Sequence, residues 1–312
     1  MHEGQLTVDA TQVAALVREQ LPAWGDLPVR ALPQLGTVNA SFRLGDDLVV
    51  RLPLVAGDVG AARAQRDAEA AAARLLVGQV GVETPEPVAT GEPGPGVPVP
   101  WSVWTWVPGE VATPTSHASS SLLADDLAAA VAALRTIPTG GRTFAGGGRG
   151  GSLPDHDAWV ATCLRRSDGL VDVAPLRRLW ARLRELPPSP GGDVTTHGDL
   201  VPGNIVVAGG RLAGLVDVGG AGPADPALDL VGAWHLLDAP ARAAFRDALG
   251  TPDLEWARGA AWALEQALGL GWYYRDSNPV MSQTGLRTLG RLADGAAELM
   301  SPTRPRVRRL RG

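Results

Sequence analysis

The chain has 312 residues, 45% of them hydrophobic and 20% charged, which is typical of a globular protein long enough for two lobes with a core each. No window approaches the ~18 consecutive apolar residues of a membrane span, and the N-terminus has no apolar run that would serve as a signal peptide. A net charge of −5 argues against nucleic acid as a partner, while a single cysteine, Cys163, excludes an internal disulfide and fits the reducing cytoplasm, where we expect the protein to reside.

The first third of the chain alternates helical and extended patterns. After Asp9, apolar residues recur at helical spacing, and Gln12 completes a capping pair with Asp9. Two short apolar runs follow, joined by a hairpin turn at 44–48, and then an alanine-rich helix from about residue 61 to 76. A Pro/Gly-rich region leads to WSVWTWV at 101–107, which predicts a buried strand.

Helical patterns dominate the remainder. Residues 121–137 and 171–186 have amphipathic spacing, a tight hairpin surrounds Gly209-Gly210, and helices fill the chain to about residue 300. The glycine-rich run at 140–154 could be taken for a phosphate-binding loop, but a P-loop requires a lysine and this chain has none. We therefore interpret the run as a flexible loop between helices.

A strand-rich first third before a helix-rich remainder predicts an α+β fold with two lobes, residues 1–107 and 108–312. The second lobe ends in a basic tail, since five arginines fall within residues 304–312. Such a tail is either an electrostatic docking arm or a solvated chain end.

The strongest chemical signal is the sequence H-G-D, which ends at Asp199 and is followed by Asn204 and, after a hairpin, by D-V-G beginning at Asp217. Phosphoryl transfer needs a carboxylate that orients or deprotonates the attacking hydroxyl, and oxygen ligands for the Mg²⁺ ion that bridges the nucleotide phosphates. This spacing offers Asp199 as the base, and Asn204 and Asp217 as metal ligands. The alternative interpretation makes both aspartates turn or cap residues.

This pattern resembles the catalytic and metal-binding loops of protein kinases. It is closer still to the aminoglycoside phosphotransferase family, which reads H-G-D-x-x-x-x-N, then D-x-G, then D-x-x-x-D, supplied here by Asp225 and Asp229. The resemblance covers roughly residues 30–300 and implies a protein-kinase-like fold, with an N-terminal β-sheet lobe and a larger helical C-terminal lobe. It also implies that Asp229 braces the catalytic loop and that His197 has a structural role.

The same resemblance implies a nucleotide clamp in the first third. The stretch that contains Gly36, Asn39 and Ser41 matches the family's phosphate-covering loop. Arg51 stands where the family normally carries a lysine that pairs with phosphates. Arginine can also pair with phosphate, so Arg51 is the expected cation and Glu69, on the alanine-rich helix, its expected partner.

Two further segments are matched to ligands by the resemblance. WTWVPGE corresponds to the linker between lobes, so the backbone of Thr105 and Val107 is expected to bind the adenine edge, although a plain core strand would read the same way. On the helices near the C-terminus, Glu265, Tyr273 and Asp276 would suit a polyhydroxylated, cationic acceptor. The alternative for Glu265 and Asp276 is ordinary exposed helix and turn positions.

The expected function is thus transfer of the γ-phosphate of ATP, with Mg²⁺, to a hydroxyl of a small molecule such as an aminoglycoside-type antibiotic; GTP is not excluded as donor. Two alternatives stay open: a kinase for a macrolide, sugar or amino alcohol, and a nucleotide-binding pseudokinase, suggested by the missing lysine. Macrolide kinases of this superfamily tend to have histidine where Asn204 stands, which disfavours that acceptor. The sequence does not indicate the oligomeric state.

Overall fold

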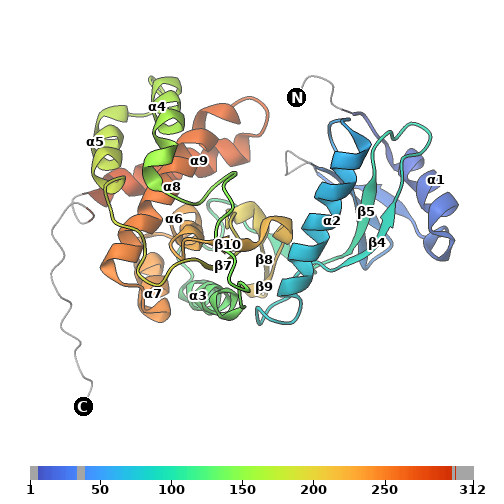
Figure 1. Cartoon of the computed structure of the whole chain (residues 1–312), viewed down its shortest axis with the longest axis horizontal. Coiled ribbons are helices and arrows are strands. Elements are labelled where there is room, and N and C mark those ends of the chain that lie inside the picture. Colours follow the sequence, from blue (N-terminus) through green and yellow to red (C-terminus); the bar gives the residue numbers. More distant parts are fainter. Residues whose placement is uncertain (1–5, 34–38, 297–298, 300–312) are drawn as a thin grey trace, which may run out of the picture.

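The computed structural model describes residues 6–33 and 39–296 together with residue 299, so Gly36 and the basic tail lie outside the described residues. The helices are α1 (Ala10–Gln20), α2 (Val59–Leu76), α3 (Ser121–Thr136), α4 (Asp157–Arg166), α5 (Val173–Leu183), α6 (Val231–Leu236), α7 (Ala239–Leu249), α8 (Asp253–Tyr273) and α9 (Pro279–Asp294). The strands are β1 (Val29–Ala31), β2 (Asn39–Leu44), β3 (Leu48–Pro53), β4 (Pro87–Gly91), β5 (Trp101–Thr105), β6 (Glu110–Val111), β7 (Val194–Thr196), β8 (Ile205–Ala208), β9 (Arg211–Leu215) and β10 (Gly222–Ala224). Figure 1 shows the sheet-bearing N-terminal third beside the larger helical part. In the described part of the chain, no helix is both long and apolar enough to cross a bilayer.

The N-terminal third is built on an antiparallel sheet with strand order β1-β2-β3-β5-β4. Successive side chains of a strand point to opposite faces of the sheet. Val50 and Leu52 of β3 therefore pack with Trp101 of β5 and with Leu16 of α1 in one apolar core. Arg51, between them, lies on the other face, which is turned toward the helical part.

Two local predictions are confirmed. The Asp9 carboxylate accepts a hydrogen bond from the backbone N–H of Gln12 (2.9 Å), and the Gln12 side chain accepts one from the N–H of Asp9 (2.9 Å), so α1 begins with a capping box. The β2–β3 hairpin turns at Gly45, whose φ of +60° suits glycine. The predicted strand at 101–107 is shorter in the structure and ends at Thr105.

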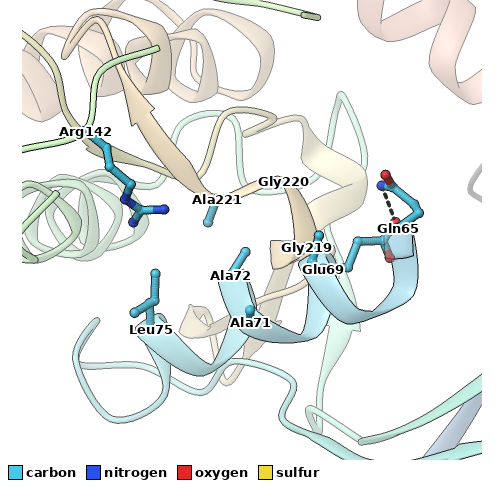
Figure 2. A pocket seen from close by; sticks show the side chains of 10 residues that line it. Gln65, Glu69, Ala71, Ala72, Leu75, Arg142, Gly219, Gly220 and Ala221 are labelled. Atoms are coloured by element: carbon cyan, nitrogen blue, oxygen red, sulfur yellow. Dashed lines mark hydrogen bonds between the residues drawn. The ribbon is translucent and has the colours of Figure 1, made fainter. Parts of the chain in front are cut away.

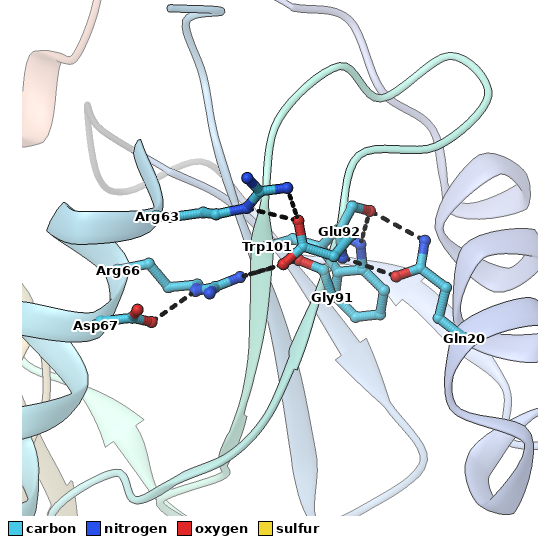
Figure 3. Close-up of polar contacts among 7 residues, drawn as sticks. All are labelled: Gln20, Arg63, Arg66, Asp67, Gly91, Glu92 and Trp101. Atoms are coloured by element: carbon cyan, nitrogen blue, oxygen red, sulfur yellow. Dashed lines mark hydrogen bonds and ion pairs between the residues drawn. The ribbon is translucent and has the colours of Figure 1, made fainter. Parts of the chain in front are cut away.

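A polar cluster centred on Glu92 fixes α1 and α2 to the sheet (Figure 3). The Glu92 carboxylate, just after β4, accepts hydrogen bonds from Arg63 and Arg66 of α2, and the pair with Arg63 lowers the pKa of Glu92. Its backbone carbonyl accepts from the side chains of Gln20 (3.0 Å) and Trp101 (3.0 Å). These contacts fix α2 against the β4–β5 side of the sheet and α1 against the same segment.

The C-terminal part packs its helices around two small sheets, β6-β8-β9 and β10-β7, over a larger apolar core. It is joined to the N-terminal part at Glu83, whose N–H donates to the carbonyl of Ala213 (3.1 Å) and whose carbonyl accepts from the N–H of Leu215 (3.0 Å). As Figure 1 shows, α2 stands between the five-stranded sheet and the C-terminal part. Its inner residues Ala73 and Leu76 belong to the larger core.

Candidate active site

The segment after β7 forms the loop that carries Asp199. Gly198 has a φ of +82°, which L side chains rarely adopt, and this accounts for the glycine in H-G-D. The Asp229 carboxylate accepts hydrogen bonds from the N–H groups of His197 (2.8 Å) and Gly198 (2.9 Å). The His197 ring accepts from the N–H of Asp199 (3.3 Å) and donates through Nε2 to the carbonyl of Val216 (3.0 Å). The bracing role predicted for Asp229 and the structural role predicted for His197 are confirmed.

Asp229 is only 1% exposed. Burial raises the pKa of this carboxyl group, against the opposing effect of His197 and of the two N–H groups that it accepts. A side chain enclosed in this way shapes the loop and has no access to a ligand.

Asn204 and Asp217 lie beside Asp199. The Asn204 side-chain nitrogen donates to the backbone carbonyl of Asp199 (2.8 Å) and is 3.5 Å from its Oδ2. The N–H of Val216 donates to the carbonyl of Asn204 (2.9 Å), which brings the chain after the β8–β9 hairpin back to the loop. Asp217 then takes a left-handed conformation with a φ of 59°. Since its nitrogen is engaged, Asn204 has its side-chain oxygen left to ligate a cation.

The described residues contain no group of three or more His, Cys, Asp or Glu side chains that could hold a metal ion. A cation at Asn204 and Asp217 would therefore take further ligands from phosphate or water. That requirement matches Mg²⁺, which usually binds through one or two carboxylates together with substrate phosphates.

Arg51 reaches across from β3 to this loop. Its guanidinium forms an ion pair with the Asp217 carboxylate (2.8 Å) and lies over the ring of Trp104, 5.2 Å from the ring centroid. The Arg51 side chain is 16% exposed and that of Asp217 is 53% exposed. Ser41 of β2 lies opposite Arg51 in the sheet register, so the two side chains share one face of the sheet. Asn39 and Ser41 were expected in a loop, but both belong to strand β2.

The expected pair between Arg51 and Glu69 is replaced by this contact with Asp217. Glu69 instead accepts a hydrogen bond from the side chain of Gln65 (2.9 Å). The reason is the close approach of α2 to the turn after Asp217: a Cβ atom at Gly219 would lie 2.9 Å from the Glu69 side chain. Glu69 therefore packs against the turn on the α2 side of Asp217.

The same contact borders a cavity of about 570 Å³ between α2 and the turn. Figure 2 shows one face of α2, from Gln65 to Leu75, along one wall and Arg142 on the opposite side. Small side chains, Ala71 and Ala72 among them, form much of the α2 wall. The cavity thus adjoins the candidate metal-binding turn without including Asp199 in its lining.

The expected adenine-binding segment follows β5. The N–H of Thr105 donates to the carbonyl of Glu86 (2.9 Å), and its hydroxyl accepts from the N–H of Glu86 (2.9 Å). A base that contacts the backbone of Thr105 would therefore have to use its carbonyl, because its N–H is engaged. Val107 is 5% exposed and packs into the protein, as the core interpretation of this strand also requires.

The three expected acceptor residues do not share one environment. Glu265 is 5% exposed; one carboxylate oxygen contacts Nδ1 of His156 (3.2 Å), and the other is enclosed without a hydrogen-bond partner. The contact with Glu265 is the main cause of the raised pKa of His156, and the carbonyl of Gly150 acts in the same direction. Tyr273, 48% exposed, and Asp276 lie at the surface near the C-terminal end of α8.

Sequence reasoning missed Arg149. Its guanidinium forms an ion pair with the Asp199 carboxylate, and the two side chains are 33% and 37% exposed, respectively. Arg149 belongs to the glycine-rich loop, where no periodicity indicates which side chain points inward. The charge of the expected base is therefore paired by a residue 50 positions earlier in the chain.

A second polar contact that the sequence did not reveal lies under the catalytic loop. Asp225 accepts hydrogen bonds from Arg258 (2.8 Å), Ser189 (2.6 Å) and Trp262 (3.1 Å). Burial acts to raise the pKa of Asp225, but these hydrogen bonds and the charge of Arg258 outweigh it and leave the pKa lowered. Asp225 thus fixes α8 beneath the loop as a buried anion.

Residues 31–262 match the phosphotransferase enzyme family. The chain belongs to this family. It is 34% identical to an aminoglycoside 3'-phosphotransferase of Escherichia coli over 82 residues, 23% of this chain and 30% of that protein. It is 27% identical to another E. coli aminoglycoside 3'-phosphotransferase over 150 residues, 44% of this chain and 53% of that protein. The chain therefore spans from about a third to about half of the length of these curated relatives.

Solved structures of aminoglycoside and macrolide phosphotransferases share the fold over nearly the whole chain. The GDP complex of aminoglycoside 2'-phosphotransferase-IIIa superimposes with a TM-score of 0.67 at 20% identity, covering 93% of this chain and 99% of that one. The macrolide 2'-phosphotransferase from Brachybacterium faecium gives a TM-score of 0.57 at 19% identity, covering 95% and 99%. The predicted α+β fold, with an N-terminal sheet and a larger helical part, is confirmed.

Proposed function

We propose that this protein transfers the γ-phosphoryl group of ATP to a hydroxyl group of a small molecule. The observation that carries the proposal is the convergence of Asp199, Asn204, Asp217 and Arg51, which come from three segments. Direct contacts join Asn204 to Asp199 and Arg51 to Asp217, and the backbone hydrogen bond from Val216 to Asn204 brings the two pairs together. Phosphoryl transfer relies on positioning and electrostatic stabilisation by such a set. Membership of the phosphotransferase enzyme family supports the same reaction.

In this proposal, residues 1–107 form the nucleotide-clamping lobe and residues 108–312 the catalytic and acceptor-binding lobe. Asp199 orients the acceptor hydroxyl and takes its proton while the hydroxyl oxygen bonds to the γ-phosphorus and the bridging oxygen leaves with ADP. Arg51 exchanges Asp217 for the nucleotide phosphates when the nucleotide binds. The proposed nucleotide-binding residues are Gly36, Asn39, Ser41, Arg51, Glu69, Thr105 and Val107.

The residues at the turn fit Mg²⁺. The Asp217 carboxylate and the side-chain oxygen of Asn204 are hard oxygen donors of the kind that this ion prefers. Mg²⁺ bound there would neutralise charge that develops on the phosphates. Release of Asp217 by Arg51 would make the carboxylate available to the ion.

We propose a polyhydroxylated acceptor, with aminoglycosides as the first candidates because the matched relatives carry that name. Tyr273 and Asp276, at the surface, are the proposed acceptor contacts. Glu265 acts through His156, which in turn donates to the carbonyl of Gly150 in the glycine-rich loop (3.1 Å). A cytoplasmic location, where ATP is plentiful, fits this reaction.

The test is turnover with MgATP and MgGTP against aminoglycosides, macrolides and sugars. Asp199→Asn should lower kcat by about 10²- to 10⁴-fold and leave the nucleotide Kd unchanged, because a positioned base acts in the transition state. Asp172→Asn is the matched control, since asparagine caps α5 as well as aspartate does.

Near-normal turnover in Asp199→Asn would contradict the assignment. Nucleotide binding by the wild type without transfer to any acceptor of the panel would favour the pseudokinase. The observation behind that alternative is the absence of lysine from the chain, with Arg51 engaged by Asp217.

A further inference from the structure

The loop at residues 137–152, between α3 and α4, brings a cation to the expected catalytic base. Its Arg149 pairs with Oδ1 of Asp199, one of the two oxygens that could receive a proton from an attacking hydroxyl. The Oδ2 atom lies 3.5 Å from the side-chain nitrogen of Asn204. Both oxygens of Asp199 thus face a donor from the protein.

Arg149 is held in this position from behind by a chain of buried hydrogen bonds. The oxygen of the Gln266 side chain accepts from Nε and Nη1 of Arg149 (2.9 Å each), and its nitrogen donates to Nε2 of His235 (2.7 Å). His235 then donates through Nδ1 to the hydroxyl of Thr288 (2.9 Å), which donates to the carbonyl of Thr284 (2.8 Å). Gln266, His235 and Thr288 are at most 3% exposed. The guanidinium is therefore anchored to three helices, α6, α8 and α9.

The glycine-rich loop is fixed at both sides of Arg149. The N–H of Phe144 donates to the Asp193 carboxylate (2.7 Å), and Nε2 of His156 donates to the carbonyl of Gly150 (3.1 Å). The ring of Phe144 packs so closely on Gly150 that a Cβ atom there would lie 2.5 Å from the ring. Because both nitrogens of His156 face acceptors, Glu265 and Gly150, its charged form is favoured. These contacts replace the flexibility that the composition predicted.

A carboxylate that activates a hydroxyl beside the γ-phosphate can also activate water. In that idle reaction the water oxygen bonds to the γ-phosphorus, and the bridging oxygen leaves with ADP. The products are ADP and inorganic phosphate, and the proton passes to Asp199 and then to solvent. A kinase in which Asp199 were unpaired would lose nucleotide in this way whenever no acceptor was bound.

We propose that Arg149 is a positioning residue that keeps Asp199 from activating water until an acceptor displaces the guanidinium. The proposal rests on the proposed function, since it takes Asp199 as the base. The acceptor hydroxyl takes the place of Arg149 on the carboxylate, and Gln266 retains the guanidinium beside it. Arg149 thereby lets Asp199 activate the acceptor hydroxyl but not water, which is the competing nucleophile.

The experiment measures phosphate release from MgATP without any acceptor. Arg149→Gln should raise this rate by about tenfold or more, a part of the ~10²- to 10⁴-fold contribution of a positioned base. Arg149→Lys keeps a cation and should stay near the wild-type rate, and Arg149→Gln combined with Asp199→Asn should lose the increase. Arg165→Gln is the matched control, because Arg165 lies on α4, outside the cavity, and donates to the hydroxyl of Thr162 (3.0 Å).

An unchanged rate in Arg149→Gln, or an equal rise in Arg165→Gln, would overturn the proposal. If Arg149→Gln fails to fold, the same hydrolysis rate is measured in Arg149→Ala. Thermal unfolding shows that each variant is folded, and MgATP titration shows that it still binds the nucleotide. If the wild type binds MgATP and phosphorylates an acceptor while the hydrolysis rate is unmoved, only the role of Arg149 fails. If the wild type does not bind MgATP, the proposed function fails with it.

Discussion

His235 should make the stability of the protein depend on pH. Its side chain is 0% exposed, and burial lowers its pKa to about 4, while the charge of Asp199 favours the protonated form and the charges of Arg149 and Arg291 oppose it. In the unfolded chain the pKa returns to about 6.5. As the pH falls below 6.5, the unfolded chain binds a proton that the folded protein does not bind. The folded state therefore loses stability down to about pH 4, and this residue has little effect above pH 7.

The magnitude follows from the shift. Between pH 7 and pH 5, about one and a half pH units lie below the unfolded-state pKa of about 6.5. At about 1.36 kcal/mol per unit, the free energy of unfolding therefore falls by about 2 kcal/mol. The assay is urea unfolding, followed by tryptophan fluorescence, at both pH values for the wild type and His235→Asn. Asparagine does not titrate and retains an N–H group for Thr288.

The wild type should lose about 2 kcal/mol more than His235→Asn between pH 7 and pH 5. Comparing the two proteins cancels the contribution of every other titrating group. An equal loss in both would refute the reasoning, because it would mean that His235 binds a proton as readily in the folded protein as in the unfolded chain.

Two predictions concern other charged pairs. Arg51→Ala should weaken MgATP binding by about 10- to 100-fold, which is the contribution of a hydrogen bond to a charged group, whereas Arg51→Lys should retain much of the affinity. Calorimetric titration measures both affinities, and an unchanged MgATP affinity in Arg51→Ala would show that Arg51 does not bind the nucleotide. Asp225→Asn should lower the free energy of unfolding by about 3–5 kcal/mol because it leaves the Arg258 charge buried without its partner, and denaturant unfolding with a loss below about 1 kcal/mol would contradict this.

Local patterns in the sequence were enough to predict much of the fold and the central part of the site. The capping pair at Asp9, the hairpin at Gly45 and the spacing of Asp199, Asn204 and Asp217 depend on residues close in the chain. A turn or a hairpin then brings these groups together without reference to distant segments. Such features can be read from sequence because short-range geometry dictates them.

The partners of the charged residues depended on distances that sequence does not give. Arg51 was expected to meet Glu69, but the approach of α2 to Gly219 directs Glu69 elsewhere and leaves Asp217 within reach. Glu265 lies in α8, whose residues from 258 to 271 are all buried, so the helical pattern has no polar face that would indicate its surroundings. Arg149 lies in a loop without periodicity, and no local pattern could have linked it to Asp199.

The backbone bridge at Glu83 has a mechanical consequence. Both hydrogen-bonding groups of this residue are bound to β9, and the chain itself crosses between β5 and β6, so the backbones of the two parts are joined at two places. A motion that kept both joints and separated the side-chain contacts elsewhere would be a rotation about the line through them, with the largest travel far from them. Gly214 sets how tightly this joint closes, since a Cβ atom there would lie 2.4 Å from the carbonyl oxygen of Glu83. Glycine at position 214 therefore allows the backbone of β9 to contact the backbone of Glu83 directly.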